Sequence, residues 1–270
     1  MSSLQSRVLV AVIGVPVLVW VVLWAPAIVM LFALCLLAGI GAMELQKCVS
    51  GVKHDRLTNL SFTYAFFTVA CYYFRPHLVT VLFVLAALIF FGYAICKAGE
   101  VKFAQIMAGL FGSIAIGYSF SAFLRLEASG IHRAYLLLPF ILSFACDTFA
   151  YFAGMAFGKH KLAPRVSPKK TIEGAVGGLA GGMLGMIIFR IVFFLVTEVQ
   201  LNIAWCVVLG LAGAAMGQLG DLSFSAVKRE CGIKDYGRLL PGHGGVLDRF
   251  DSVIFAAPVV WLIIRSITLY

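Results

Sequence analysis

Charged residues are scarce in this chain of 270 residues: they make up 12% of it, against 62% hydrophobic residues, and the mean hydropathy is +1.01. Soluble domains carry about 25% charged and about 45–50% apolar residues. One globular core cannot hide so much apolar surface, so the surplus must face lipid. The composition therefore excludes an ordinary soluble domain.

Acidic residues are scarcer still, 12 against 21 basic ones, which gives a net charge of +9. Few of these basic residues are free to face water, so we expect an anionic membrane surface or an anionic substrate as their partner, and no nucleic acid. The seven cysteines include no Cys-x-x-Cys pair, and neither a zinc site nor a disulfide framework is indicated. Alternating apolar patterning is also missing, which excludes a membrane β-barrel.

Long continuous apolar runs are what the chain has instead. A hydrocarbon core about 30 Å thick needs about 20 apolar residues per helix. Nine runs approach this length, two of them being short: residues 8–24, 28–42, 60–74, 78–95, 106–124, 135–154, 175–196, 203–220 and 252–269. The sequence predicts an all-α polytopic transmembrane bundle of about nine spans.

Lysine and arginine are distributed unevenly between alternate loops. Sixteen lie at the N-terminus and in the even-numbered loops, and four lie in the others, with Arg190 inside the seventh run. Because positive loops stay in the cytoplasm, this asymmetry predicts a cytoplasmic N-terminus in a cell membrane, most readily a bacterial inner membrane. We expect residues 1–130 to form an N-terminal membrane region. Residues 131–270 would form a catalytic region whose two long basic loops face the cytoplasm.

Four aspartates fall at one cytoplasmic depth of these predicted spans. Asp147 lies inside the sixth run, Asp221 follows the eighth, and Asp248 and Asp251 open the ninth. A charged group inside a membrane helix costs about 2.5–3.5 kcal/mol, so Asp147 in particular indicates function. Mg²⁺ prefers carboxylate oxygens and takes only one or two from protein. Taken singly, these acids also fit a helix cap, an ion pair with a nearby arginine or a wetted helix end.

The first long loop, residues 158–174, is basic and cannot be one helix because it contains Pro164 and Pro168. It delivers Lys169, Lys170 and Thr171 to the start of the seventh helix, where free amides and the helix dipole favour phosphate. Glu173 fits a helix-start charge or an acceptor for a ligand amino or hydroxyl group. The Walker spacing is absent, which disfavours an ATPase. The simpler alternative is a loop that is basic only because it is cytoplasmic.

The second long loop, residues 221–251, combines the same charges with glycine. On a continued helix, Asp221, Ser225 and Lys228 or Arg229 share one face. The run PGHGG, residues 241–245, must turn, and its glycines let backbone amides approach an anion. His243 within this turn is either a phosphate ligand or merely structural.

Between Ser225 and Asp251 the second loop resembles the signature of phosphatidate cytidylyltransferases, also called CDP-diacylglycerol synthases, at the constrained positions of that pattern: SxVKR, four residues, KDxG, two residues, LPxHGGVxDRFD. Three upstream stretches are similar to the same family: Asp147-Thr148-x-Ala150-Tyr151, Gly158-Lys159 and VSPKKTIEG over residues 166–174. The resemblance covers about the C-terminal half of the chain. Residues 1–130 show only polytopic character.

The resemblance implies Mg²⁺-dependent condensation of CTP with phosphatidic acid, giving CDP-diacylglycerol and pyrophosphate. On this basis we assign Asp221 and Asp248 to the metal, with Asp251 as a third candidate, and place Asp147 beside them. The other assignments are Lys169, Lys170, Thr171 and Glu173 to CTP, Ser225, Lys228, Arg229 and His243 to the phosphates of either substrate, and Arg249 to substrate binding.

Two other functions remain open at this stage. A secondary transporter also fits a basic bundle with buried acids, although transporters place their sites near the midplane of two repeated halves. An enzyme that consumes CDP-diacylglycerol is disfavoured because no Asp-Gly-x-x-Ala-Arg string occurs. Glycines recur every four residues in the seventh run, from 174 to 182 and from 177 to 185. This spacing favours close helix packing and allows a homodimer contact.

Overall fold

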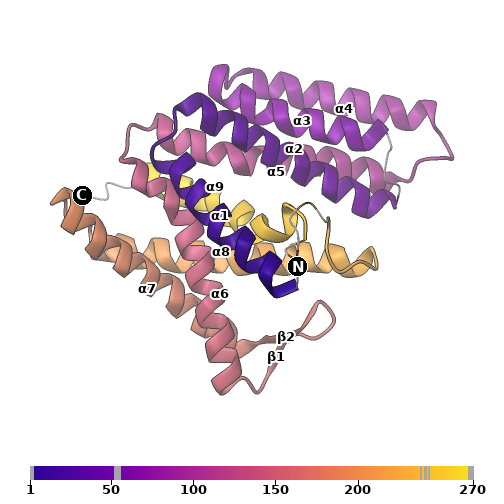
Figure 1. Ribbon diagram of the computed structural model, residues 1–270. Helices are drawn as coiled ribbons and strands as arrows, with labels where there is room; N and C mark the ends of the chain where they lie inside the picture. Colours follow the sequence, from indigo (N-terminus) through magenta and orange to yellow (C-terminus); the bar gives the residue numbers. More distant parts are fainter. Residues whose placement is uncertain (1–2, 52–55, 238, 240–241, 243, 267–270) are drawn as a thin grey trace. The chain divides into compact units, whose positions relative to one another are not determined.

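The computed structural model describes residues 3–51, 56–237, 239, 242 and 244–266, and it is helical almost throughout (Figure 1). The all-α architecture is confirmed. Within the described residues there are nine α-helices, one 3-10 helix and two short strands: α1 (Ser3–Leu23), α2 (Ala27–Ser50), α3 (Arg56–Phe74), α4 (Leu78–Cys96), α5 (Phe103–Ala128), η1 (Arg133–Leu137), α6 (Leu138–Phe157), β1 (Lys161–Ala163), β2 (Ser167–Thr171), α7 (Ile172–Thr197), α8 (Ile203–Glu230) and α9 (Leu247–Ser266).

The chain divides into two compact units. Unit 1 comprises Met1–Ala128 with Glu230–Phe250, and unit 2 comprises Ser129–Arg229 with Asp251–Tyr270. One boundary between the units lies between Ala128 and Ser129. The division into an N-terminal membrane region, residues 1–130, and a catalytic region, residues 131–270, stays a prediction. The segment 230–250 belongs to unit 1, although we had grouped it with the C-terminal half.

Unit 1 is built around helices α2, α3 and α5, with α4 alongside (Figure 1). Leu57, Tyr64, Phe90 and Ile106 form one buried apolar cluster, in which the rings of Tyr64 and Phe90 lie 5.9 Å apart. Of α4, only Ala86 and Phe90 are buried, and large apolar side chains cover the rest of its surface. Such an exposed apolar surface is unsuited to water and is of the kind that membrane helices present to lipid.

Unit 2 contains α6 and α7 packed along their lengths, with α8 beside them. The glycine stripes of α7 allow this approach. A Cβ on Gly177 or Gly181 would collide with α6, and one on Gly182 would collide with Ala214 of α8. Both stripes therefore serve packing within the chain, as small residues do between membrane helices. A homodimer stays a prediction.

Replacing Gly182 by alanine should destabilise unit 2, because the new methyl group would also lie 2.7 Å from the Gly210 carbonyl oxygen. Overpacking of this kind costs about 1–3 kcal/mol. The matched control is Gly92→Ala in α4, where a Cβ meets no atom within 4 Å. Thermal unfolding in detergent should show a lower midpoint for Gly182→Ala and an unchanged or higher one for Gly92→Ala. Equal midpoints would refute the packing role of Gly182.

Six described helical segments are long and apolar enough to cross a membrane: Ala27–Ser50, Leu78–Cys96, Phe103–Ala128, Arg133–Phe157, Ile172–Thr197 and Ile203–Glu230. Of the other three helices, α3 carries polar residues such as Thr58, Ser61 and Thr68, which are buried within unit 1. Helix α9 has Asp248 in its first turn and Arg265 in its last, which shortens its apolar part. The count of nine spans stays a prediction.

The two long basic loops are more regular than the sequence suggested. The first is not helical, as its prolines require, but it forms an antiparallel hairpin of β1 and β2 in which Lys161 pairs with Thr171. For the second loop, the prediction that the eighth helix ends at residue 220 is wrong, because α8 continues through Asp221 to Glu230. The polar residues after Gly220 keep the helical spacing, and this continuity holds the charged side chains on a rigid element.

Candidate functional site

A pocket of about 420 Å³ opens among four elements of unit 2: α6, the β1–β2 hairpin, the start of α7, and α8. Helix α6 contributes one face, with Asp147, Tyr151 and Gly154 spaced by whole turns. The full lining is Asp147, Ala150, Tyr151, Gly154, Met155, Leu162, Lys169, Lys170, Thr171, Gly174, Ala175, Gln218 and Asp221. Five of the predicted site residues are therefore brought together: Asp147, Lys169, Lys170, Thr171 and Asp221.

The hairpin presents two lysines at the N-terminus of α7, as the sequence predicted. Thr171 is the N-cap residue, and its hydroxyl oxygen accepts a hydrogen bond from the Gly174 amide at 3.1 Å. Lys169 and Lys170 precede it directly on β2 and line the pocket. Because the cap fixes where the strand ends and the helix begins, it also fixes the direction from which both ammonium groups approach.

Replacing Thr171 by valine should remove this cap while keeping the side-chain shape. Loss of an N-cap costs about 1 kcal/mol, so the thermal midpoint should fall. Thr171→Ser retains the hydroxyl acceptor and should restore the midpoint, measured by thermal unfolding in detergent. If the serine variant were as destabilised as the valine variant, the cap would not be the stabilising interaction.

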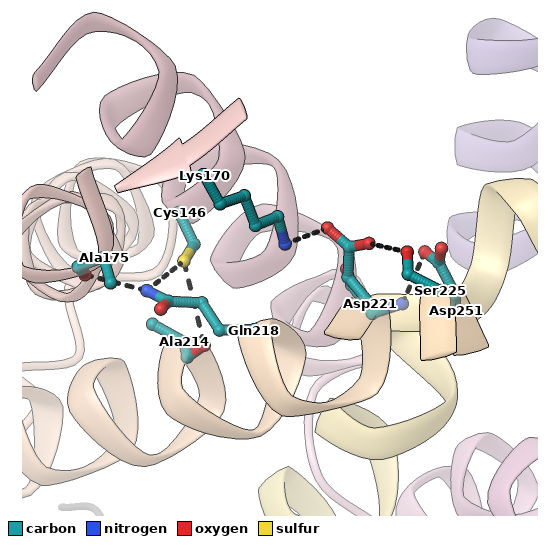
Figure 2. Close-up of polar contacts among 9 residues, drawn as sticks. Cys146, Lys170, Ala175, Ala214, Gln218, Asp221, Ser225 and Asp251 are labelled. Atoms are coloured by element: carbon teal, nitrogen blue, oxygen red, sulfur yellow. Dashed lines mark hydrogen bonds and ion pairs between the residues drawn. The ribbon is translucent and has the colours of Figure 1, made fainter. Parts of the chain in front are cut away.

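Asp221 makes two side-chain contacts at the pocket. The Lys170 ammonium donates to its Oδ2 atom, and the Ser225 hydroxyl donates to its Oδ1 atom at 3.2 Å (Figure 2). The predicted column on α8 is thus present, with Ser225 one turn after Asp221. The next turn carries Lys228, which is half-buried, and Arg229, whose Nε donates to the Val166 carbonyl in the hairpin turn at 3.3 Å.

Gln218 belongs to the same column and was missed by sequence reasoning. Its Nε2 donates to the Ala175 carbonyl oxygen at 2.9 Å and to the Cys146 sulfur at 3.2 Å, so it links α8 to α7 and α6 (Figure 2). A polar amide three residues before Asp221 in an apolar helix was the available signal. With the amide nitrogen held in this way, the Gln218 side chain has a defined orientation at the pocket wall.

Glu173 closes the base of the hairpin. Its carboxylate accepts hydrogen bonds from the Lys159 amide at 3.1 Å and the His160 amide at 3.2 Å, and it contacts His160 Nδ1 at 2.6 Å. These contacts agree with the helix-start charge that we considered and place Glu173 outside the pocket lining. Its assignment to CTP stays a prediction.

Asp251 lies on α9 where this helix touches α8. A Cβ on Gly220 would collide with the Asp251 carbonyl oxygen, so the two helix backbones are in contact one residue before Asp221. Asp251 is close enough to Asp221 and Asp147 for electrostatic interaction, and Lys228 supplies a nearby positive charge. Three of the four predicted acids are therefore neighbours within unit 2.

Asp248, the fourth acid, belongs to unit 1 and is 9% exposed. Its Oδ2 atom accepts hydrogen bonds from the Tyr236 amide at 2.8 Å and the Gly245 amide at 3.0 Å. Gly244 has a φ of +85°, a conformation that glycine adopts readily. Asp248 therefore organises the glycine-rich segment before α9. Its neighbour Arg249 is exposed, and His243 lies outside the described residues.

The acidic oxygen donors of unit 2 are of the type that Mg²⁺ prefers, and the metal itself stays a prediction. Among the described residues, no group of three histidine, cysteine, aspartate or glutamate side chains converges as a metal cage. Mg²⁺ does not require one, because it commonly takes one or two carboxylates and completes its shell with water and phosphate oxygens. Asp221 and Asp251 supply such a pair of hard oxygen donors beside the pocket.

Glu44, near the end of α2, is a second residue that sequence reasoning missed. It is 4% exposed, and its carboxylate accepts hydrogen bonds from the amides of Val246 at 3.1 Å and Leu247 at 2.8 Å. The available signal was an acid just after the apolar run of residues 28–42. Its partners lie about 200 residues further along the chain, at a distance that no local pattern reveals.

Comparison with known proteins gives one family match and several relatives. The model of a family described as "Cytidylyltransferase family" matches residues 5–267. A phosphatidate cytidylyltransferase of Staphylococcus epidermidis is 32% identical over 261 residues, which cover 95% of this chain and 97% of that protein. Proteins of the same name from Staphylococcus haemolyticus and Staphylococcus aureus are 36% identical over 172 and 170 residues, or 64% and 62% of each chain. Both long loops lie within the matched range.

Proposed function

Because the chain belongs to the cytidylyltransferase family, we propose that it condenses CTP with phosphatidic acid to form CDP-diacylglycerol and pyrophosphate. This is a nucleotidyl transfer in phospholipid biosynthesis, and both the family and the relatives' name support it. Neither supports the transporter alternative.

The observation that carries the proposal is the pocket in which Lys170 and Asp221 meet at the start of α7. An oxygen of the phosphatidate phosphate attacks the α-phosphorus of CTP, and the bond to the β-phosphate oxygen breaks as pyrophosphate leaves. The lipid phosphate is already an anionic nucleophile. The task of the protein is therefore to bring two polyanions together in line and to neutralise charge on the leaving group.

The residues of the pocket have the charges for this task. Lys169 and Lys170 face the nucleotide phosphates together with the amides at the start of α7, for which Thr171 sets the geometry. Ser225, Lys228 and Arg229 continue the polar face of α8 toward the phosphates of either substrate. His243 and Arg249 complete the proposed phosphate ligands.

Magnesium is the proposed cofactor. Asp221 and Asp251 would hold it, with Asp147 beside them and Asp248 as a further predicted ligand. When bound, Mg²⁺ supplies positive charge and Lewis acidity to the phosphate oxygens. Lys170 shares Asp221 with this site, so a single carboxylate connects the proposed metal to the nucleotide side of the pocket.

The proposed orientation places the pocket at the cytoplasmic side of the membrane, with nine spans and a cytoplasmic N-terminus. The bias of 16 to 4 in lysine and arginine supports this orientation. At that depth CTP arrives from the cytoplasm, and phosphatidic acid enters from the inner leaflet.

The test is a product assay with purified protein in detergent, radiolabelled CTP, phosphatidic acid and Mg²⁺. We expect label in a lipid product identified as CDP-diacylglycerol, with one pyrophosphate released per product. UTP, ATP and dCTP run in parallel define the base and sugar requirement. Absence of a CDP-lipid under all these conditions would overturn the proposal, and substrate flux in vesicles would then favour a transporter.

A further inference from the structure

Glu44 is a buried acid that the proposed chemistry does not use. At 4% exposed it is among the most buried charged side chains of unit 1, and it lies two turns before the end of α2. A buried carboxylate is costly unless its oxygens accept hydrogen bonds. Both Glu44 oxygens do so: Oε1 accepts from the Val246 amide and Oε2 from the Leu247 amide.

The Leu247 amide is the first of α9, which begins at this residue, and the Val246 amide directly precedes it. The first amides of a helix have no intrahelical partner, and the helix dipole favours a negative charge at that end. Glu44 therefore acts as a cap supplied by a different helix. It fixes the start of α9 at Leu247, the residue that directly precedes Asp248.

The glycine-rich segment before α9 is shaped to fit the same carboxylate. A Cβ on Gly245 or on Gly237 would collide with the Glu44 oxygens. In addition, Asp248 Oδ2 accepts hydrogen bonds from the amides of Gly245 and Tyr236. The carboxylates of Glu44 and Asp248 thus both bind backbone amides near the start of α9. A larger residue at Gly237 or Gly245 would displace the Glu44 carboxylate.

We infer that Glu44 is a positioning residue: its carboxylate caps the start of α9 and so fixes the residue at which the helix that carries Asp248 and Asp251 begins. This inference rests on the proposed function, in which Asp251 and Asp248 are metal ligands. Groups that orient metal ligands without touching the metal change metal affinity or activity by about 10- to 100-fold when they are removed. Loss of the Glu44 cap should therefore weaken metal binding while the bundle remains folded.

The test compares wild type, Glu44→Gln, Glu44→Asp and the matched control Glu100→Gln. The Glu100 carboxylate is exposed and forms an ion pair with Lys97 at 3.0 Å. Backbone hydrogen exchange of the 244–252 peptide reports the cap directly. Mn²⁺ binding, followed by electron paramagnetic resonance, reports the metal site without turnover. We expect exchange of the first α9 amides to rise about tenfold in Glu44→Gln, Mn²⁺ affinity to fall about tenfold, and Glu100→Gln to match wild type.

Glu44→Asp keeps the charge on a shorter side chain and should give intermediate values; it also serves if the glutamine variant does not fold. Unchanged exchange in both variants would overturn the cap, and faster exchange with unchanged Mn²⁺ affinity would overturn the positioning role. Failure of the proposed function is distinguishable, because wild-type protein would then bind Mn²⁺ but form no CDP-lipid from CTP and phosphatidic acid.

Discussion

Asp221→Asn is expected to reduce kcat for CDP-diacylglycerol formation about 100- to 1000-fold, the usual effect of removing a group that stabilises transition-state charge. The amide keeps the size of the side chain and can still accept from Ser225. It loses the charge that pairs with Lys170 and would bind Mg²⁺. The variant should still insert into membranes, purify and melt near the wild-type temperature, because Asp221 is not part of the apolar packing of α8.

The matched control for Asp221→Asn is Glu198→Gln, a change from carboxylate to amide at an exposed position of the same unit. Turnover is measured at saturating CTP and phosphatidic acid over a range of Mg²⁺ concentrations. Activity within a few-fold of wild type in the Asp221 variant would remove this residue from the site.

Lys170→Met is expected to have the second-largest effect. The change removes the ammonium group, and a hydrogen bond to a charged group is worth about 1.5–3 kcal/mol, or about 10- to 100-fold in kcat/KM for CTP. Lys161→Met is the control, since Lys161 is an exposed lysine of the same hairpin outside the pocket lining. Equal losses in the two variants would mean that Lys170 contributes only general positive charge.

The double variant Asp221→Asn with Lys170→Met tests whether the two residues act together. Because their side chains are in direct contact, their effects should be non-additive by about 0.5–3 kcal/mol. Measured kcat/KM values for wild type, both single variants and the double variant give this coupling. Strict additivity would show that the contact has no part in the reaction.

The parts of the fold that depend on local pattern were predictable. Apolar run length identified the helices, and Pro164 and Pro168 excluded a helix in the first loop. Helical spacing placed Ser225 beside Asp221, and the end of the proline-containing loop placed Lys169 and Lys170 at the start of α7. In each case one element and its immediate neighbours determine the outcome.

The parts that depend on partners far along the chain were not predictable. Nothing in the sequence near Glu44 indicates that its carboxylate binds amides of Val246 and Leu247. Asp248 and Asp251 are three residues apart, yet Asp248 holds a loop of unit 1 and Asp251 packs on α8 in unit 2. Periodicity reports which side chains share a face, but it does not report what that face contacts.

Nucleotide labelling tests most directly whether the pocket of α6, the hairpin, α7 and α8 is the CTP site. A photoreactive CTP analogue is crosslinked to the purified protein with Mg²⁺, with and without excess CTP, and the labelled peptides are identified by mass spectrometry. We predict CTP-protected label in residues 167–175 or 214–221, and its loss in Lys170→Met. Protected label confined to helices α3 to α5 would contradict this assignment of the site.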